Sequence, residues 1–151
     1  MHPKFDDFLE NIVNLEDEQK EEIGRTALKD IYKRLHERED CSREECAQWV
    51  IDITKLFVSA DKKTAIREYE FFKNVTGIDL TSDEFYNATN HGSDEEFVRK
   101  MIIRIKDLYK ETRQAILVYA AALASSDDSI IGGEIDLFEQ LTEDDDFEDD
   151  D

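Results

Sequence analysis

Helix-breaking residues are scarce in this chain of 151 residues, which contains one Pro and five Gly. A fold of strands and turns needs more of these residues to reverse the chain, so their scarcity favours long helices with short connections. Hydrophobic residues make up 40% of the sequence, which is enough for a buried core in one domain of this length. We therefore expect a helical fold.

Apolar residues recur at helical spacing along most of the chain, as expected for helices with one buried face. Seven such stripes are Phe5, Phe8, Leu9, Ile12 and Val13; Ile23, Ala27, Ile31 and Leu35; Cys46, Trp49, Val50, Ile53 and Phe57; Tyr69, Phe72 and Val75; Phe97, Met101, Ile105 and Leu108; Ile116, Leu117, Ala120 and Leu123; and Ile135, Phe138 and Leu141. With a further helix after Thr81, they predict an all-α, single compact domain of about eight helices over residues 1–142. No segment predicts a strand.

Helix start and stop signals agree with these stripes. Ser42–Glu45 (SREE), Thr81–Glu84 (TSDE) and Ser93–Glu96 (SDEE) each have the form of a capping box. In this motif the hydroxyl accepts from the backbone N–H three residues later, and the Glu reaches back. Gly77 is a predicted stop for the helix that carries Tyr69.

Acidic residues dominate the charge, with 39 Asp and Glu against 19 Lys and Arg and a net charge of −20. Residues 143–151 (EDDDFEDDD) contain eight of these acids, and we expect this tail to be disordered because its charges cannot share a core. Residues 1–142 keep a net charge of −12, which repels phosphate backbones and argues against nucleic acid. Cations and proteins with a basic surface remain the expected partners.

Localisation is predicted from the absence of targeting patterns. The N-terminal segment MHPKFDDFLENI is acidic and lacks a long apolar run, and the run AILVYAAALA is too short to cross a bilayer. The two cysteines, Cys41 and Cys46, fit a reducing compartment. We expect a cytoplasmic protein that is not inserted in a membrane.

Two segments 66 residues apart align without a gap and carry matched acids. In FVSADKKTAIREYEFF (residues 57–72) and LASSDDSIIGGEIDLF (residues 123–138), Asp61 matches Asp127 and Glu68 matches Glu134. Each copy has an acid after an apolar helix and a second acid seven residues later, at the start of the next helix. This pattern predicts an internal helix–loop–helix pseudo-repeat. Four converging carboxylates would suit a hard divalent cation such as Ca²⁺ or Mg²⁺.

A purely structural interpretation of these two loops is equally open. An Asp at the end of a helix commonly accepts from nearby backbone N–H groups, and a Glu in a first turn complements the helix dipole. Lys62, Lys63 and Arg67 also supply positive charge at the first loop. Neither loop has the ligand spacing of an EF-hand, although Gly132 falls at the sixth position after Asp127.

The histidine and cysteine residues are weaker candidates for a metal site than the paired acids. His36, Cys41 and Cys46 lie in HEREDCSREEC, but zinc sites need paired ligands at short spacing, and Cys46 falls on an apolar stripe. His91 lies in an expected turn. No nucleophile, phosphate-loop or metalloprotease motif is present, so the sequence predicts no enzyme.

The paired SAD and SSD segments, each followed by Asp-x6-Glu, resemble the tellurite-resistance TerB-like family over residues 42–142. The resemblance implies a non-enzymatic helical domain associated with tellurite and stress resistance. It also implies that Asp61, Glu68, Asp127 and Glu134 gather on one face, where a role with divalent cations has been proposed.

This chain differs from the TerB-like pattern directly after each loop acid. Lys62 and Asp128 stand where the family usually has Gly, which restricts the loop backbone and adds a competing cation to the first loop. The main alternative is therefore an acidic interaction module whose loops are structural. A metal-dependent hydrolase is a third option, and it requires a cleft beside the acids.

Overall fold

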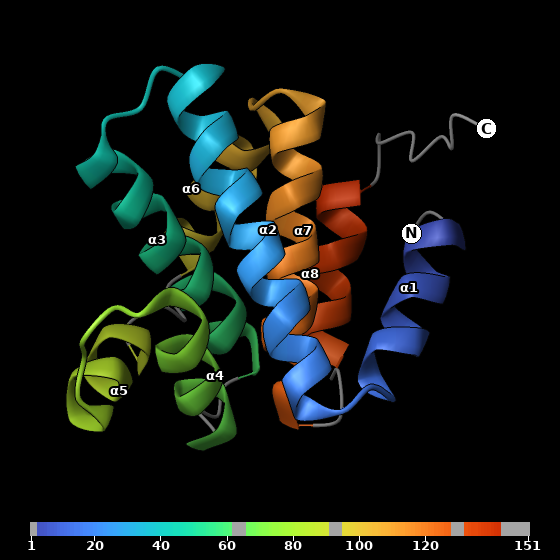
Figure 1. The fold of residues 1–151 in the computed structure, drawn as a ribbon. Helices are drawn as coiled ribbons and strands as arrows, with labels where there is room; N and C mark the ends of the chain where they lie inside the picture. Colours follow the sequence, from blue (N-terminus) through green and yellow to red (C-terminus); the bar gives the residue numbers. More distant parts are fainter. Residues whose placement is uncertain (1–2, 62–65, 91–94, 128–131, 143–151) are drawn as a thin grey trace.

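The computed structural model describes residues 3–61, 66–90, 95–127 and 132–142. These residues form α-helices and a short 3-10 helix (η2), and none of them lies in a strand. The elements are α1 Pro3–Val13, α2 Asp17–Glu37, α3 Arg43–Asp61, α4 Ile66–Thr76, α5 Ser82–Asn90, α6 Glu95–Lys106, α7 Lys110–Ala124, η2 Ser125–Asp127 and α8 Gly132–Thr142. The predicted all-α, compact architecture with eight helices is confirmed for the described part of the chain (Figure 1).

Most residues of the predicted stripes face the core, but Leu108, which was expected on the stripe with Met101 and Ile105, lies beyond the end of α6 at Lys106 and is partly buried. In α3, for example, Val50, Ile53 and Phe57 have no exposed surface. In α1, Phe5 and Leu9 are buried while Phe8 is only partly covered. In α2, Ala27, Ile31 and Leu35 of the predicted stripe are buried and Ile23 is partly covered. Helical spacing of apolar residues was therefore sufficient to locate these elements.

Two of the three predicted capping boxes are present. Ser42 Oγ accepts from the Glu45 backbone N–H at 3.1 Å, and the Ser42 N–H donates to Glu45 Oε1 at 2.7 Å. In the second box, Thr81 Oγ1 accepts from the Glu84 backbone N–H at 3.1 Å, and the Thr81 N–H donates to Glu84 Oε1 at 2.9 Å. Gly77 follows the last residue of α4 with φ of 69° and donates to the Lys73 carbonyl, so the predicted stop is confirmed.

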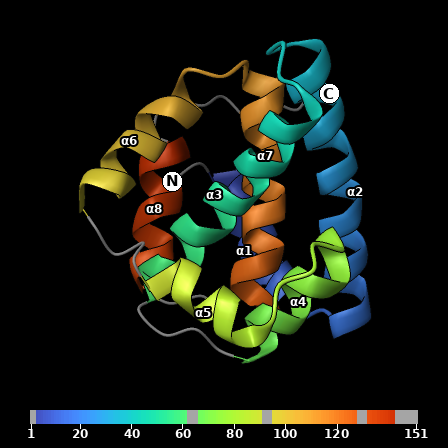
Figure 2. The same cartoon turned by 90° about the vertical axis from the view of Figure 1, so that its left-hand side faces the viewer.

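Helix α7 is the central element of the bundle. It packs along α2 over much of its length and also contacts α1, α3 and α4 (Figures 1 and 2). Its apolar run AILVYAAALA is buried on nearly every side, with Val118 only partly covered. Small side chains such as Ala120 and Ala121 let neighbouring helices approach closely, which explains why this helix is apolar all round.

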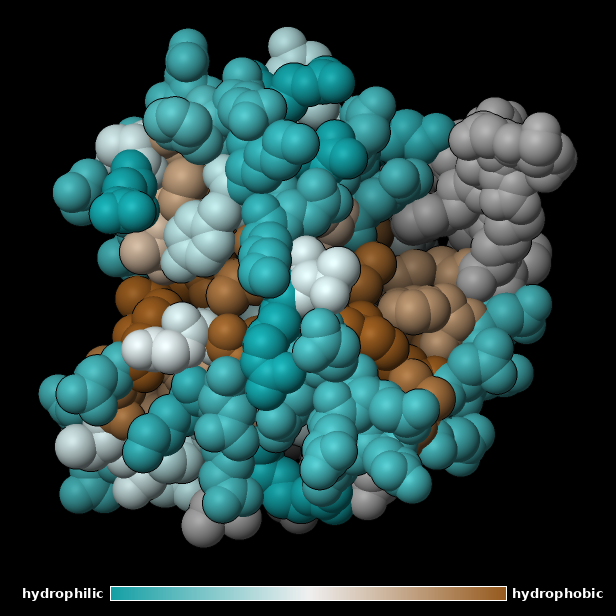
Figure 3. Space-filling model, viewed as in Figure 1, coloured by the Kyte–Doolittle hydropathy of each residue, from teal (hydrophilic) through white to brown (hydrophobic). Residues whose placement is uncertain are grey.

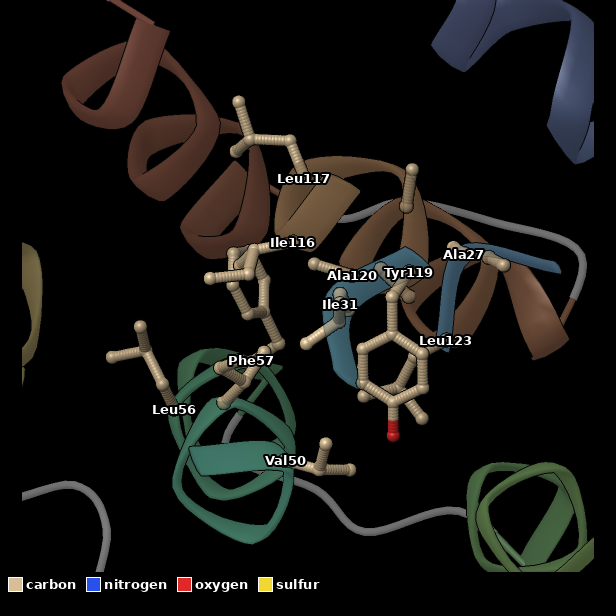
Figure 4. Packing of buried hydrophobic residues seen from close by; sticks show 14 of the residues in the cluster. Ala27, Ile31, Val50, Leu56, Phe57, Ile116, Leu117, Tyr119, Ala120 and Leu123 are labelled. Atoms are coloured by element: carbon tan, nitrogen blue, oxygen red, sulfur yellow. The ribbon is translucent and has the colours of Figure 1, made fainter. Parts of the chain in front are cut away.

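Side chains of α2, α3 and α7 meet in the core (Figure 4). Tyr119 of α7 has no exposed surface, and its hydroxyl lies 2.7 Å from Oγ1 of Thr54 in α3. Thr54 Oγ1 in turn donates to the Val50 carbonyl at 2.8 Å. Burial raises the pKa of the Tyr119 hydroxyl well above its ordinary value. The hydroxyl groups of Tyr119 and Thr54 are therefore hydrogen-bonded within the core, as buried hydroxyls generally are.

Gly24 allows α4 to pack closely on α2. A Cβ at this position would lie 2.8 Å from Cζ of Phe71 and 3.2 Å from Cγ1 of Val75, both in α4. Contacts between α2 and α4 are accordingly numerous, and Phe71 is 3% exposed. A side chain on Gly24 would therefore require Phe71 and Val75, or helix α4 itself, to shift.

Three expectations fall on parts of the chain that the structure does not describe. They are the capping hydroxyl of Ser93, the turn that contains His91, and the acidic tail, residues 143–151. None of the described helices is long and apolar enough to cross a membrane.

Candidate functional site

The four predicted cation ligands occupy equivalent places in two helix–loop–helix segments. Asp61 is the last residue of α3 and Glu68 is the third residue of α4. Asp127 is the last residue of η2, and Glu134 is the third residue of α8. Among these four, the structure describes only the side chain of Glu68.

The elements that carry these acids contact each other between the two segments: each helix or 3-10 helix of one segment lies against an element of the other. Helix α4, with Glu68, contacts η2, which ends in Asp127, and α3, which ends in Asp61, contacts α8. The ends of α3 and η2 and the starts of α4 and α8 lie at the same end of the bundle (Figures 1 and 2). The fold therefore brings the helix ends that flank the two predicted loops to one end of the molecule.

Glu68 is fully buried, with no exposed surface. A carboxylate in such a place is stable only if positive charge or hydrogen-bond donors compensate for its lost hydration. Its position in the first turn of α4 supplies part of this compensation, because the N-terminal end of a helix is electropositive. Sequence spacing identified Glu68 as a candidate but gave no indication of its burial.

Lys20 is a second buried charge at this end of the bundle. Its side chain is 1% exposed, and Nζ donates a hydrogen bond of 2.7 Å to the carbonyl oxygen of Ser125. Ser125 is the C-cap residue of α7, so the ammonium lies at the electronegative end of that helix. The sequence analysis missed Lys20, although it lies three residues before Ile23 on the apolar stripe of α2. A charged residue on such a stripe was the available signal.

The serines before Asp127 close the end of α7. Ser125 Oγ donates to the Ala122 carbonyl at 3.1 Å, and Ser126 Oγ donates to the Leu123 carbonyl at 2.7 Å. Both serines are buried. The SSD segment thus folds into η2 by satisfying carbonyl groups at the end of its own helix. This local structure supports the structural interpretation for these two hydroxyls.

A small polar pocket lies between α2 and α4, next to η2. Its volume is about 160 Å³, and its lining residues are Asp17, Lys20, Glu21, Arg67, Glu70, Phe71, Asn74 and Ser126. Two of these lining residues are joined, because Arg67 donates to both carboxylate oxygens of Asp17, at 2.6 and 2.8 Å. Arg67 was expected to bring positive charge to the first loop, and it also ties α4 to the start of α2.

The histidine and cysteines of HEREDCSREEC have structural surroundings. Cys46 is 2% exposed in the core, and Nδ1 of His36 lies 3.1 Å from the Cys41 carbonyl oxygen. Burial, followed by nearby acids, raises the pKa of the Cys41 thiol; burial also raises that of Cys46. In the described part of the chain, no three His, Cys, Asp or Glu side chains are grouped to hold a metal. The zinc interpretation therefore receives no support from the placement of these three residues.

Comparison with known proteins identifies no relative. No family model matches the chain, no curated protein matches it, and no solved structure matches its fold. The functional inference therefore depends on the residues and geometry described above.

Proposed function

We propose that this chain is a non-enzymatic, cytoplasmic TerB-like protein that binds a divalent cation, Ca²⁺ or Mg²⁺, at its paired loops. Asp61, Glu68, Asp127 and Glu134 provide the ligands in this proposal. The resemblance of the two Asp-x6-Glu segments associates the protein with tellurite and stress resistance. Carboxylate oxygens are the ligands that these hard cations prefer.

The complete burial of Glu68 is the observation that carries this proposal. Helix α4 holds this carboxylate inside the protein and packs against η2, whose last residue is Asp127. A second acid brought toward a buried carboxylate raises the local negative charge, and a bound cation offsets the repulsion.

The crosswise contacts support an internal pseudo-repeat. The first helix of one segment, α3, contacts the second helix of the other, α8. The second helix of the first segment, α4, contacts α7 and η2 of the other. Two diverged copies related by a pseudo-two-fold axis produce this exchange of contacts. In the cation proposal, the same relationship would bring equivalent acids toward a shared centre.

The second candidate function is an acidic interaction module that docks a basic protein surface, and Lys20 is the observation that favours it. The buried ammonium already places positive charge at the end of α7, two residues before Asp127. In this case Lys20 replaces the metal, and the loops have a structural role. The net charge of −20 then attracts the partner.

A hydrolase is the least favoured option. The pocket formed by α2 and α4 beside the candidate ligands has a volume of about 160 Å³. Small-molecule sites typically enclose about 300–1,000 Å³. We therefore favour binding over catalysis.

Thermal unfolding of the full chain with and without millimolar Ca²⁺ or Mg²⁺ tests the cation proposal. Binding to the folded state alone raises its stability by about 2.7 kcal/mol at a ligand concentration 100 times Kd. For a domain of this size the melting temperature should then rise by about 5–10 °C. Asp127→Asn should abolish this rise because it removes a ligand charge.

Asp136→Asn provides the matched control, because Asp136 is an exposed acid in the same helix as Glu134. Both variants retain the acidic tail, so weak binding of cations to the tail affects them equally. The control should keep the full cation-dependent rise. An equal rise in both variants, or no rise in the unmodified chain, would reject the cation site and leave the interaction module as the function.

A further inference from the structure

A pocket lies between the end of α2 and the start of α3. Its volume is about 640 Å³, and its lining residues are Tyr32 and His36 of α2 and Arg43, Cys46 and Ala47 of α3. Figure 3 shows apolar surface between the polar side chains of these two helices. Small-molecule sites typically enclose about 300–1,000 Å³. Helix α3, which is 19 residues and about 28 Å long, separates this pocket from the paired loops.

The floor of the pocket is apolar and uncharged. Cys46 is 2% exposed, and burial raises the pKa of its thiol, so the thiol stays protonated and behaves as a small apolar group. Ala47 follows it and is partly buried. Burial, followed by the neighbouring Cys46, also raises the pKa of the Tyr32 hydroxyl, which therefore keeps its proton and can donate to an anion.

The side chains of the pocket lining that can carry a positive charge are Arg43 and His36, and no acid belongs to the lining in the described part of the chain. Arg43 is exposed and forms no ion pair with any described side chain. Nδ1 of His36 lies 3.1 Å from the Cys41 carbonyl oxygen. A carbonyl can only accept, so Nδ1 carries a proton and Nε2 is the nitrogen available to a ligand.

The charge of Glu45 reaches Cys46, but the carboxylate of Glu45 already accepts from the Ser42 backbone N–H at 2.7 Å. Glu45 belongs to the cap of α3 and not to the pocket lining. The groove between α2 and α7 is different, because acids and lysines both line its volume of about 580 Å³. The pocket between α2 and α3 therefore favours an anion, whereas the α2–α7 groove does not.

An organic acid complements both parts of this lining. Its carboxylate can accept two parallel hydrogen bonds from a guanidinium group, and its apolar body can leave water on the floor of the pocket. A small molecule contacts only the lining, and charges more than about 8 Å away are largely screened at physiological ionic strength. An acidic protein would instead bring its surface against the rest of a chain with a net charge of −20.

We propose that the pocket between α2 and α3 binds a small organic acid, with the carboxylate against Arg43 and His36 and the apolar body on Cys46 and Ala47. This proposal is independent of cation binding at the paired loops, because it uses none of the same residues.

Titration of the full chain with phenylacetate, followed by methyl NMR, tests the proposal. The methyl resonance of Ala47 should shift along a saturable curve with a Kd of about 1 mM, the order expected for a ligand of this size. The methyl resonance of Ala115, which lines the α2–α7 groove, should stay in place. The absence of a saturable shift at Ala47 up to about 10 mM phenylacetate would overturn the proposal. Equal shifts at both alanines would also overturn it, because they would show unspecific binding to apolar surface.

Two related probes separate the recognition of the carboxylate from that of the apolar body. Phenylacetamide lacks the charge and acetate lacks the ring, so each should bind at least about tenfold more weakly than phenylacetate. Phenylacetamide that binds as tightly as phenylacetate would reject recognition of the acid. Acetate that binds as tightly would reject the role of the apolar floor.

Arg43→Gln tests the charged contact directly. The side chain is exposed, so the variant should fold, and its Kd for phenylacetate should rise about tenfold. Arg99→Gln, at an exposed arginine of α6, is the matched control and should leave the Kd unchanged. An unchanged Kd in Arg43→Gln would reject the assigned site. Shifts at Ala47 that depend on protein concentration without the probe would also reject it, because they would assign the pocket to contact between copies.

Discussion

The ammonium group of Lys20 donates a hydrogen bond of 2.7 Å to the carbonyl oxygen of Ser125, across 105 residues of sequence. This contact joins the start of α2 to the end of α7, the two helices with the most extensive interface in the bundle. It also places a positive charge beside η2, which carries Asp127. Lys20 is therefore important both for stability and for the choice between the two proposed functions.

Lys20→Met should destabilise the protein by about 2–3 kcal/mol. The substitution keeps most of the buried chain but removes a charged hydrogen bond, and a carbonyl at the end of α7 loses its donor. Urea unfolding measures the change as a lower midpoint with an unchanged slope. Lys73→Met is the control, because Lys73 is exposed on α4 and should change stability by less than about 0.5 kcal/mol. Equal effects of the two substitutions would show that the buried contact contributes nothing.

Gly24→Ala should destabilise the protein although Ala is the better helix former. The substitution gains about 1 kcal/mol in helix propensity. Its Cβ would lie 2.8 Å from Phe71 Cζ and 3.2 Å from Val75 Cγ1, however, and such overpacking costs about 1–3 kcal/mol. The net loss should be about 1 kcal/mol in a urea titration. Adding Phe71→Leu should recover part of this loss, and a stabilised Gly24→Ala protein would contradict the close contact of α2 with α4.

Tyr119 should make stability fall at alkaline pH. Burial raises its pKa above the value of 10.0 in the unfolded chain, so the folded state retains the proton more strongly. The contribution of protonated Tyr119 to the free energy of unfolding is fully present below pH 10 and decreases as the pH rises above 10. Urea midpoints measured from pH 8 to pH 11 should show this decrease.

Tyr119→Phe isolates this contribution from those of other titrating groups. At pH 8 the variant should be less stable by about 1 kcal/mol, because it loses the hydrogen bond to Thr54. Above pH 10 the difference from the unmodified protein should narrow and then reverse. A constant difference across the range would mean that Tyr119 does not titrate with unfolding.

Ser42→Ala should reduce stability by about 1 kcal/mol through loss of the α3 N-cap. The Ser42 hydroxyl accepts from the Glu45 N–H at 3.1 Å. In the same capping box the Ser42 backbone N–H donates to the Glu45 carboxylate at 2.7 Å, and this second bond lowers the pKa of Glu45. Ser42→Thr is the conservative control and should retain most of the stability in thermal unfolding. A loss with Thr equal to that with Ala would argue against capping by the hydroxyl.

The predictable part of the fold depends on contacts close in sequence. Stripes such as Val50, Ile53 and Phe57, and the capping box of Ser42 with Glu45, involve residues three or four apart. The spacing of these residues in the sequence is therefore enough to predict the helix and its cap. Gly77 was predictable for the same reason, since a helix stop needs only the local backbone conformation.

The remaining features depend on distant segments. Lys20 lies on an apolar stripe, but its acceptor, Ser125, is in another part of the chain. The role of Gly24 depends on Phe71, which reaches it from α4. For the candidate site, sequence spacing predicted that Asp61, Glu68, Asp127 and Glu134 occupy equivalent positions. It could not predict the burial of Glu68, because burial depends on the packing of α4 against η2.

The central position of α7 also determines the order in which the protein acquires structure. This helix is encoded late in the chain, yet α1, α2, α3 and α4 all contact it. A nascent chain that ends before Lys110 lacks the helix that forms the most extensive interface with α2. The contacts of α7 with α1 to α4 join residues far apart in the sequence, so their formation carries the entropy cost of closing long loops. The earlier helices should therefore leave apolar surface exposed until synthesis reaches the end of α7.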